Sequence, residues 1–158
     1  MTIRLGRVSD APHIARLTTQ LGYDLDAASA GERLARILAR QEEQFLVADL
    51  DGRAVGWVHA VVADYVDAVR FVTIAGLVVD REQRRTGIGA ALMARAEAWA
   101  VEQGCSLVRL TSSATRTAAH RFYEGIGYTN IKTQFSFIKS LYGSGREQFG
   151  AFVPRVDQ

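Results

Sequence analysis

Arg84-Arg85-Thr86-Gly87-Ile88-Gly89 joins two segments with different hydrophobic patterns. Residues 71–79, which precede it, are apolar and rich in β-branched side chains, and this composition predicts a buried strand. Residues 90–100, which follow it, are rich in alanine and carry large apolar side chains at helical spacing, so they predict a helix. We therefore expect a strand, a tight loop and a helix in this order.

The loop has features that favour binding of an anion. The free backbone N–H groups and the dipole at the start of a helix attract negative charge, most naturally a phosphate. Gly87 and Gly89 would let a ligand approach the backbone closely, and Arg84 and Arg85 add positive charge. An ordinary strand-to-helix turn with solvated arginines explains the local pattern equally well, because short glycine motifs often match by accident.

The rest of the chain predicts a mixed α/β domain around this unit. The Asp51-Gly52 pair between two apolar runs is the turn expected in a β-hairpin. The expected elements, in order, are a strand at about 3–8, helices at about 10–21 and 30–40, strands at 45–49, 54–62 and 71–79, a helix at 90–100, a strand at 107–111, a helix at 117–126 and a strand at 128–138. This order implies antiparallel pairing in the first half and βαβ crossovers in the second.

Composition restricts the class of protein. A chain of 158 residues fits one domain, and its net charge of +2 does not indicate nucleic acid as a partner. No apolar run approaches the roughly 20 residues of a membrane span, and the N-terminus lacks the layout of a signal peptide. The single cysteine, Cys105, cannot form an intramolecular disulfide and is expected to pack in the core. We expect a cytoplasmic protein with neither a nucleic-acid nor a membrane partner.

Two motifs occur in order along the chain. Residues 84–89 fit the pattern Gln or Arg, two residues, Gly, one residue, Gly or Ala, and residues 119–128 contain Ala-x-x-Phe-Tyr followed by a glycine and an aromatic residue. Together with the element order, they resemble the GNAT superfamily of acetyl-CoA-dependent N-acetyltransferases over roughly residues 3–140. The resemblance implies a mixed α/β, GNAT-like fold in residues 1–142. Its central sheet would have about six or seven strands, splayed between the fourth and fifth, with about four flanking helices. Residues 143–158 would form a loosely ordered polar tail or an arm on a partner subunit.

The resemblance also implies a site for acetyl-CoA, with no metal. The backbone amides from about Arg85 to Ala90 would hold the pyrophosphate, and the pantetheine arm would lie along Leu77 to Val79. A backbone N–H near Leu77 would polarise the thioester carbonyl. The residues assigned to the coenzyme in this way are Leu77, Val78, Val79, Arg84, Arg85, Thr86, Gly87, Ile88, Gly89, Ala90 and Arg116. The family often has asparagine at position 116; an arginine there could reach a coenzyme phosphate or carbonyl, or could be a solvated surface residue.

Tyr123 is the candidate general acid. Helical spacing places it at the edge of an apolar arc, where the ring is buried while the hydroxyl can reach a cleft. A phenol in that position can donate a proton to the departing thiolate. Helix geometry alone favours a core tyrosine bonded to a backbone carbonyl, whereas the resemblance favours the acid.

The sequence says less about the general base and about the residues that bind the substrate amine. Many family members carry a carboxylate about two residues before the position of Leu77, where this chain has Ala75 and Gly76. Histidine titrates near neutral pH, which suits a base, but a packed or surface role for His59 and a proton path through water are alternatives. Tyr23 and His59 are candidate substrate-binding residues. Acidic residues at 24, 26, 64 and 67 could attract a cationic amine or could be solvated loop residues.

Three hypotheses follow from these residues. The first is an N-acetyltransferase that promotes direct attack by a small-molecule or peptide amine on acetyl-CoA in a ternary complex. The second, motivated by the missing carboxylate, is a non-catalytic acyl-CoA sensor or regulatory module of the same fold. The third is an interaction domain whose tail docks on a partner. A homodimer is the commonest assembly for such a chain.

Overall fold

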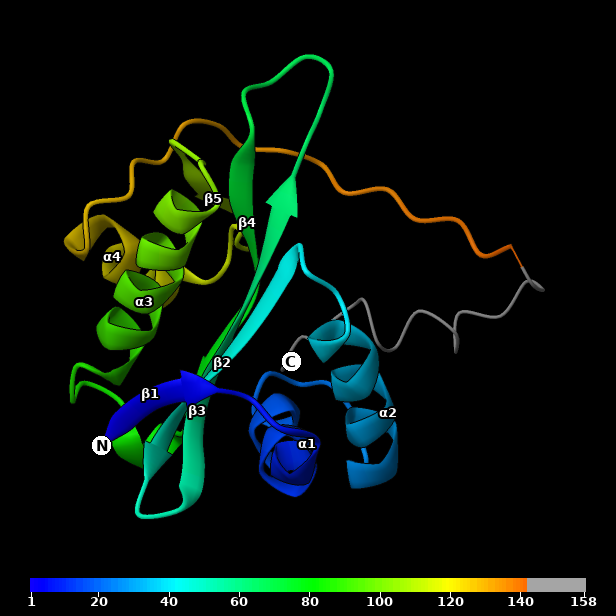
Figure 1. Ribbon diagram of the computed structural model, residues 1–158. Helices are drawn as coiled ribbons and strands as arrows, with labels where there is room; N and C mark the ends of the chain where they lie inside the picture. The colour runs from blue at the N-terminus through cyan, green and yellow to red at the C-terminus, as the bar shows by residue number, and fades with distance from the viewer. Residues whose placement is uncertain (142–158) are drawn as a thin grey trace.

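The computed structural model describes residues 1–141 and contains one mixed sheet of five strands in the order β1-β2-β3-β4-β5 (Figure 1). The strands are β1 (Thr2–Leu5), β2 (Glu43–Leu50), β3 (Arg53–Ala63), β4 (Phe71–Val79) and β5 (Val108–Leu110). The first four pair antiparallel, and β5 joins β4 in parallel after a helical crossover. The predicted mixed α/β class is therefore confirmed.

Four α-helices within residues 1–141 cover the two faces of the sheet. They are α1 (Ala11–Thr19), α2 (Ala27–Leu38), α3 (Ile88–Glu102) and α4 (Thr117–Gly125). In Figure 1, α1 and α2 lie together on one side of the sheet, while α3 and α4 lie together on the other. Helix α2 begins earlier than position 30 because the Asp26 carboxylate accepts the N–H of Ser29 at 2.8 Å and caps the helix there.

Each face of the sheet has its own apolar core. The core on the α3 side contains Leu92, Met93 and Val58, all fully buried, and Cys105 is buried there as predicted. The core on the side of α1 and α2 contains Leu17 and Leu34. Burying a side chain of this size stabilises a fold by roughly 1.5–3 kcal/mol, so α3 is held against one face of the sheet and α1 and α2 against the other. No helix in residues 1–141 is long and apolar enough to cross a membrane.

The predicted strand over residues 128–138 is absent. Residues 129–140 contain neither helix nor strand, and the sheet formed by residues 1–141 has five strands, not six or seven. Phe135 and Phe137 are 90% and 92% exposed. An alternating pattern predicts a strand only where a partner edge is available, and the neighbouring β5 is just three residues long. The predicted tail at 143–158 lies outside the described residues.

Strands β4 and β5 separate soon after they meet. They pair only at Val72, Thr73 and Ile74 of β4. The register between β3 and β4 shifts where Ala60 opposes Ile74 and His59 opposes Gly76, so Ala75 is the extra residue of a bulge. Beyond Ile74, the side of β4 that faces β5 has no strand partner in the described chain. The predicted gap between the fourth and fifth strands is thus present.

Candidate active site

The unpaired part of β4 forms one wall of the site. Ala75 is exposed, and Gly76 and Leu77 are half-buried, although they belong to a central strand of the sheet. Their backbone groups on the β5 side are available to a ligand that adds to the strand in an extended conformation. Arg84 Nε lies 3.4 Å from the carbonyl oxygen of Val79 and donates to it, which marks the end of this free edge.

The packing at Gly76 leaves no room for a carboxylate side chain at that position. A Cβ atom built on Gly76 would lie 2.7 Å from the Trp57 ring, a distance that real Cβ atoms essentially never show. Trp57 belongs to β3 and stacks on Phe45 of β2, with the two ring centroids 5.3 Å apart. The indole ring therefore occupies the space that a side chain at position 76 would need.

The loop between β4 and α3 leaves backbone donors free at the start of the helix. Arg85 and Gly87 have positive φ values of 62° and 85°, and α3 begins directly afterwards at Ile88. Its first internal hydrogen bond runs from the N–H of Ala91 to the carbonyl oxygen of Gly87. The N–H groups of residues 88–90 consequently have no partner within the helix and favour an anion.

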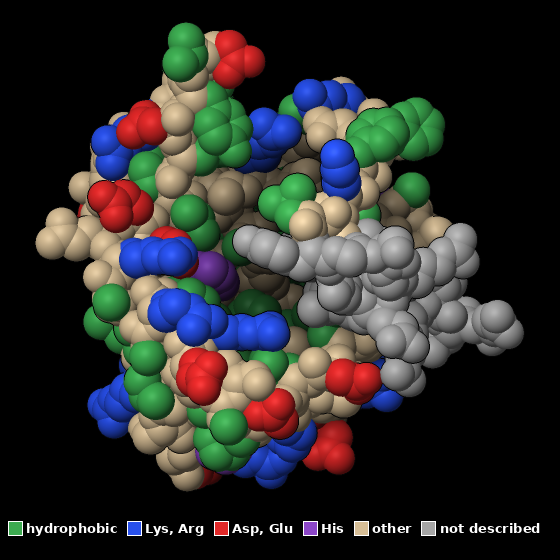
Figure 2. Space-filling model, turned by 90° about the vertical axis from the view of Figure 1, so that its right-hand side faces the viewer, with side chains coloured by type: hydrophobic (Ala, Val, Ile, Leu, Met, Phe, Trp, Pro, Cys, Tyr) green, Lys and Arg blue, Asp and Glu red, His purple; other side chains and the backbone are tan. Residues whose placement is uncertain are grey.

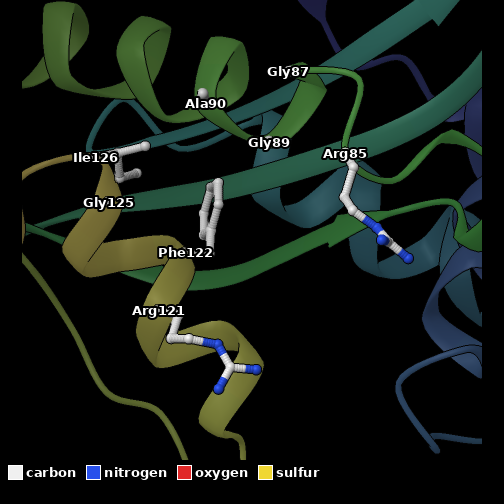
Figure 3. Close-up of a pocket in the computed structure, with 8 residues that line it drawn as sticks. All are labelled: Arg85, Gly87, Gly89, Ala90, Arg121, Phe122, Gly125 and Ile126. Carbon is white, nitrogen blue, oxygen red and sulfur yellow. The ribbon is translucent and has the colours of Figure 1, made fainter.

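A pocket of about 370 Å³ opens between the start of α3 and helix α4 (Figure 3). It is lined by Arg85, Gly87, Gly89, Ala90, Arg121, Phe122, Gly125 and Ile126. Phe122 points from α4 toward the start of α3, and a Cβ atom on Gly89 would lie 3.1 Å from the Phe122 ring. The glycine thus permits close packing of the two helices. Two guanidinium groups and no carboxylate line the pocket, so its charge suits a phosphate.

Tyr123 lies on α4 beside this pocket. Its ring packs edge-on against Phe122 and Tyr128, with centroid distances of 5.2 and 5.9 Å. Its hydroxyl makes no hydrogen bond to any residue in the described part of the chain, so it is not tied to a backbone carbonyl there. Burial raises the pKa of Tyr123, and the positive charge of Arg116 partly opposes this shift. The phenol therefore stays protonated at neutral pH and can donate a proton.

Comparison with known proteins decides the family. The model of the acetyltransferase (GNAT) family matches residues 13–128. This chain belongs to the GNAT family. It is 30% identical to aminoglycoside N(6′)-acetyltransferase type 1 of Stenotrophomonas maltophilia over 132 residues, which cover 80% of this chain and 85% of the relative. It is also 29% identical to an N-acetyltransferase of Chlorobaculum tepidum over 133 residues, covering 84% of this chain and 78% of the relative.

Solved structures show the same fold. Aminoglycoside 6′-N-acetyltransferase AAC(6′)-Ig from Acinetobacter haemolyticus superposes with a TM-score of 0.78 at 21% identity, covering 89% of this chain and 99% of the other. Aminoglycoside N-acetyltransferase AAC(6′)-Iy, solved in complex with CoA, has a TM-score of 0.79 at 22% identity, covering 87% and 93% of the two chains. The GNAT family assignment thus agrees with the fold.

The structure brings together only some of the residues expected at the coenzyme site of this GNAT domain. Arg85, Gly87, Gly89 and Ala90 line the pocket. The other side chains of the motif turn away from it: Thr86 donates to the Gln83 carbonyl at 2.6 Å, Ile88 is buried in the core, and Arg84 contacts Val79. At these positions only the backbone can serve a ligand. Of the β4 residues, Leu77 and Val79 pack on the α3 side of the sheet, and Val78 on the opposite side.

Arg121 was not predicted from the sequence. It lies within the second GNAT motif, next to Phe122. Its position in the motif was the available signal, but only the packing of α4 against α3 shows that it lines the same pocket as Arg85. Arg116, which was predicted, lies at the cap position before α4 and acts on Tyr123 through its charge, outside the residues that line the pocket.

The residues expected to bind the substrate amine differ in their burial and in their hydrogen-bond partners. Asp26 caps α2, and Asp64 lies 3.4 Å from Arg70 in an exposed ion pair. Tyr23 follows α1 and is half-buried, away from the pocket between α3 and α4. His59 is 2.8 Å from Glu43 on the neighbouring strand. Two of the acidic residues thus have structural partners, and His59 has a carboxylate partner that the sequence did not reveal.

Proposed function

We propose that this GNAT domain transfers an acetyl group from acetyl-CoA to a primary amine by direct attack in a ternary complex. The observation that carries the proposal is the juxtaposition of two features: the anion pocket at the start of α3 and the unpaired edge of β4. The pocket suits a pyrophosphate, and the edge suits an extended amide-containing arm. Coenzyme A combines both chemical groups in one molecule.

In this proposal the loop holds the coenzyme by its phosphates. The free N–H groups of residues 88–90 donate to the pyrophosphate, and the guanidinium groups of Arg85 and Arg121 neutralise its charge. Gly87 and Gly89 keep the backbone accessible, since a side chain at position 89 would meet Phe122. Arg116 adds a third positive charge close to Tyr123.

The β4 edge then positions the thioester. Backbone groups from Leu77 to Val79 pair with the pantetheine arm as a neighbouring strand would, and the N–H near Leu77 faces the carbonyl oxygen. A donor fixed in that position stabilises the negative charge that develops on this oxygen during attack, and the protein need not reorganise at that moment. Tyr123 supplies a proton to the departing sulfur.

The acceptor is proposed to be a cationic small-molecule or peptide amine. The relative from Stenotrophomonas maltophilia is named for aminoglycosides, which makes polycationic aminoglycosides the first class to test. The side chain of Asp64 is 68% exposed near the tip of the β3–β4 hairpin, where it could attract positive charge. Tyr23 is the second candidate contact on this side.

The test measures thiol release from acetyl-CoA over a panel of aminoglycosides, polyamines, amino acids and peptides. Calorimetry with coenzyme A is run in parallel. Turnover with at least one amine supports the proposal. Coenzyme binding without turnover on any amine would support the non-catalytic sensor instead, and absence of coenzyme binding would refute both.

A further inference from the structure

His59 forms a hydrogen-bonded pair with a carboxylate beside the unpaired edge of β4. Its Nε2 atom lies 2.8 Å from Glu43 Oε2, across the β2–β3 pair. Both side chains are largely buried, with exposed fractions of 16% and 10%. Arg40, at the end of α2, donates to the other oxygen of Glu43 at 2.6 Å. The carboxylate is therefore held from two sides.

The charge of Glu43 determines which nitrogen of His59 is free. Burial tends to raise the pKa of Glu43, but hydrogen bonds with Arg40 and His59 outweigh it, so the pKa lies below the usual range. An ionised carboxylate can only accept hydrogen bonds, so Nε2 of His59 must carry the hydrogen. In the neutral ring the lone pair is then on Nδ1, which has no hydrogen-bond partner among residues 1–141.

The fold places this histidine next to the part of β4 assigned to the thioester. His59 opposes Gly76 in the β3–β4 register. Its ring lies 5.8 Å from that of Phe45, which also stacks on Trp57, so it shares the sheet face covered by α1 and α2. Figure 2 shows that this side of the molecule is hollowed near its centre.

Two charged side chains lie close to the His59 ring. Glu43 on β2 is the carboxylate in contact with the ring, and Arg40, which follows α2, touches the far oxygen of that carboxylate. Gly76, which opposes His59 on β4, has no side chain and contributes no charge. A carboxylate on one nitrogen both orients an imidazole and stabilises the imidazolium, as in catalytic triads.

We propose that His59 is the general base that removes a proton from the substrate amine, with Glu43 as its positioning residue. The inference rests on the proposed acetyl transfer. It supplies the proton acceptor that β4 lacks at Ala75 and Gly76. His59 opposes Gly76 across one strand spacing, about 4.8 Å, and in this proposal the amine lies over this face of the sheet and passes its proton to Nδ1 through water.

The proton balance of the reaction is complete with these groups. Nδ1 takes one proton from the ammonium group, and the released nitrogen lone pair forms the C–N bond as the C–S bond breaks. The sulfur receives the proton of Tyr123, and the second proton of the nitrogen restores the phenol. His59 then returns its proton to solvent, and the products are an acetylated amine and a free thiol.

The decisive experiment compares the pH dependence of kcat/KM for acetyl transfer in the wild type and in His59→Gln. With the base present, the rate rises with pH and levels off once the base is deprotonated. Without it, the rate is expected to be about a hundredfold lower near neutrality and to keep rising with the fraction of unprotonated amine. An amine of low basicity, already neutral at the assay pH, should be much less affected by the substitution.

Two further variants separate catalysis from structure. Glu43→Gln retains a hydrogen-bond acceptor but removes the charge, so the acidic limb of the profile should move to lower pH. His13→Gln replaces a histidine that instead accepts the N–H of Ala54, and should leave the profile unchanged. Coenzyme A binding should be the same in all four proteins.

The outcomes distinguish this inference from the proposed function. If the wild type releases no thiol with any amine, the acetyl transfer itself fails. If the wild type is active and folded His59→Gln, with normal coenzyme binding, keeps the wild-type profile, the inference is overturned. An unshifted acidic limb in Glu43→Gln would likewise reject the role of that carboxylate.

Discussion

At the scale of single residues, the site depends on groups whose surroundings are unusual for their type. Tyr123 has a buried ring and a hydroxyl without a partner in the described chain. Tyr128, which packs against it, instead donates to Glu97 at 2.8 Å, and burial together with Glu97 raises its pKa. The hydroxyl of Tyr123 is therefore available to donate a proton, whereas the hydroxyl of Tyr128 is already hydrogen-bonded.

Replacing Tyr123 by phenylalanine should lower kcat about a hundredfold while leaving the affinity for coenzyme A unchanged, because only the proton donor is lost. Since the pKa of Tyr123 is raised, wild-type activity should not lose this donor until the pH exceeds about 10, the usual tyrosine value. Steady-state kinetics across pH check both points. Tyr128→Phe is the matched control, and equal losses in the two variants would contradict the assigned role.

Gly87 offers a second test at this scale. It has a φ of 85°, and a Cβ atom there would meet nothing within 4 Å. Gly87→Ala should therefore cost about 1–2 kcal/mol of backbone strain without a clash. Gly104, with a φ of 72° and equally open surroundings, lies at the other end of α3 and gives a matched control.

Both alanine variants should melt at similarly reduced temperatures, but only Gly87→Ala should weaken coenzyme A binding, because only position 87 adjoins the pocket. Calorimetry and thermal unfolding together measure this difference. Equal coenzyme affinity in the two variants would argue against the loop as the phosphate site.

At the scale of elements, a buried carboxylate connects α1 to the end of β4. Asp80 is 4% exposed and lies 2.7 Å from Arg16, while Gln20 donates to its other oxygen at 3.3 Å. The same residue caps the turn that leads into the phosphate loop. The helix on one face of the sheet thus fixes where the loop on the opposite face begins.

Asp80→Asn should lower the free energy of unfolding by about 2 kcal/mol, because charged hydrogen bonds to Arg16 are lost. Burial tends to raise the pKa of Asp80, but Arg16 and Gln20 outweigh it and the pKa is lowered. The stabilisation is therefore present at neutral pH, declines as the pH falls below about 4, and is lost when the folded carboxyl is protonated. Denaturant titrations at several pH values measure it.

The control for this effect is Asp64→Asn. Asp64 forms a more exposed pair with Arg70 at 3.4 Å, so its substitution should change stability by less than about 1 kcal/mol. A pH dependence of stability that survives unchanged in Asp80→Asn would assign the effect to other carboxylates.

At the scale of the whole molecule, the ligand would bridge parts of the fold that make few contacts with each other. The pocket is shared by α3 and α4, and the free edge belongs to β4, whose pairing with β5 covers only residues 72–74. A ligand bound across this gap replaces missing strand contacts and stabilises the folded state.

Coenzyme A at one hundred times its Kd should raise the free energy of unfolding by about 2.7 kcal/mol. Arg121→Gln should weaken binding about tenfold, because it removes one charged contact to phosphate. Arg95→Gln is the control, since Arg95 pairs with Glu102 on the surface of α3. Unaltered affinity in Arg121→Gln would remove that residue from the site.

The sequence by itself determined the features that depend on neighbouring residues. The Asp51-Gly52 turn, the loop with Gly87 before α3, and helices α1 to α4 follow from local backbone preferences and apolar spacing, and the two motifs place the chain in its family. A strand is different, because its pattern specifies which faces are apolar but not whether a partner edge exists. This is why the strand predicted at 128–138 is absent from the described chain.

Only the tertiary structure decided which distant residues meet. Arg121 joins Arg85 because α4 packs on α3, and the Trp57 ring occupies the space that a side chain at position 76 would need. His59 meets Glu43 through the register of β2 and β3, a pairing across sixteen positions of the chain. Such contacts form only when helices and strands that are distant in the sequence pack together. A local pattern of residues does not specify that packing.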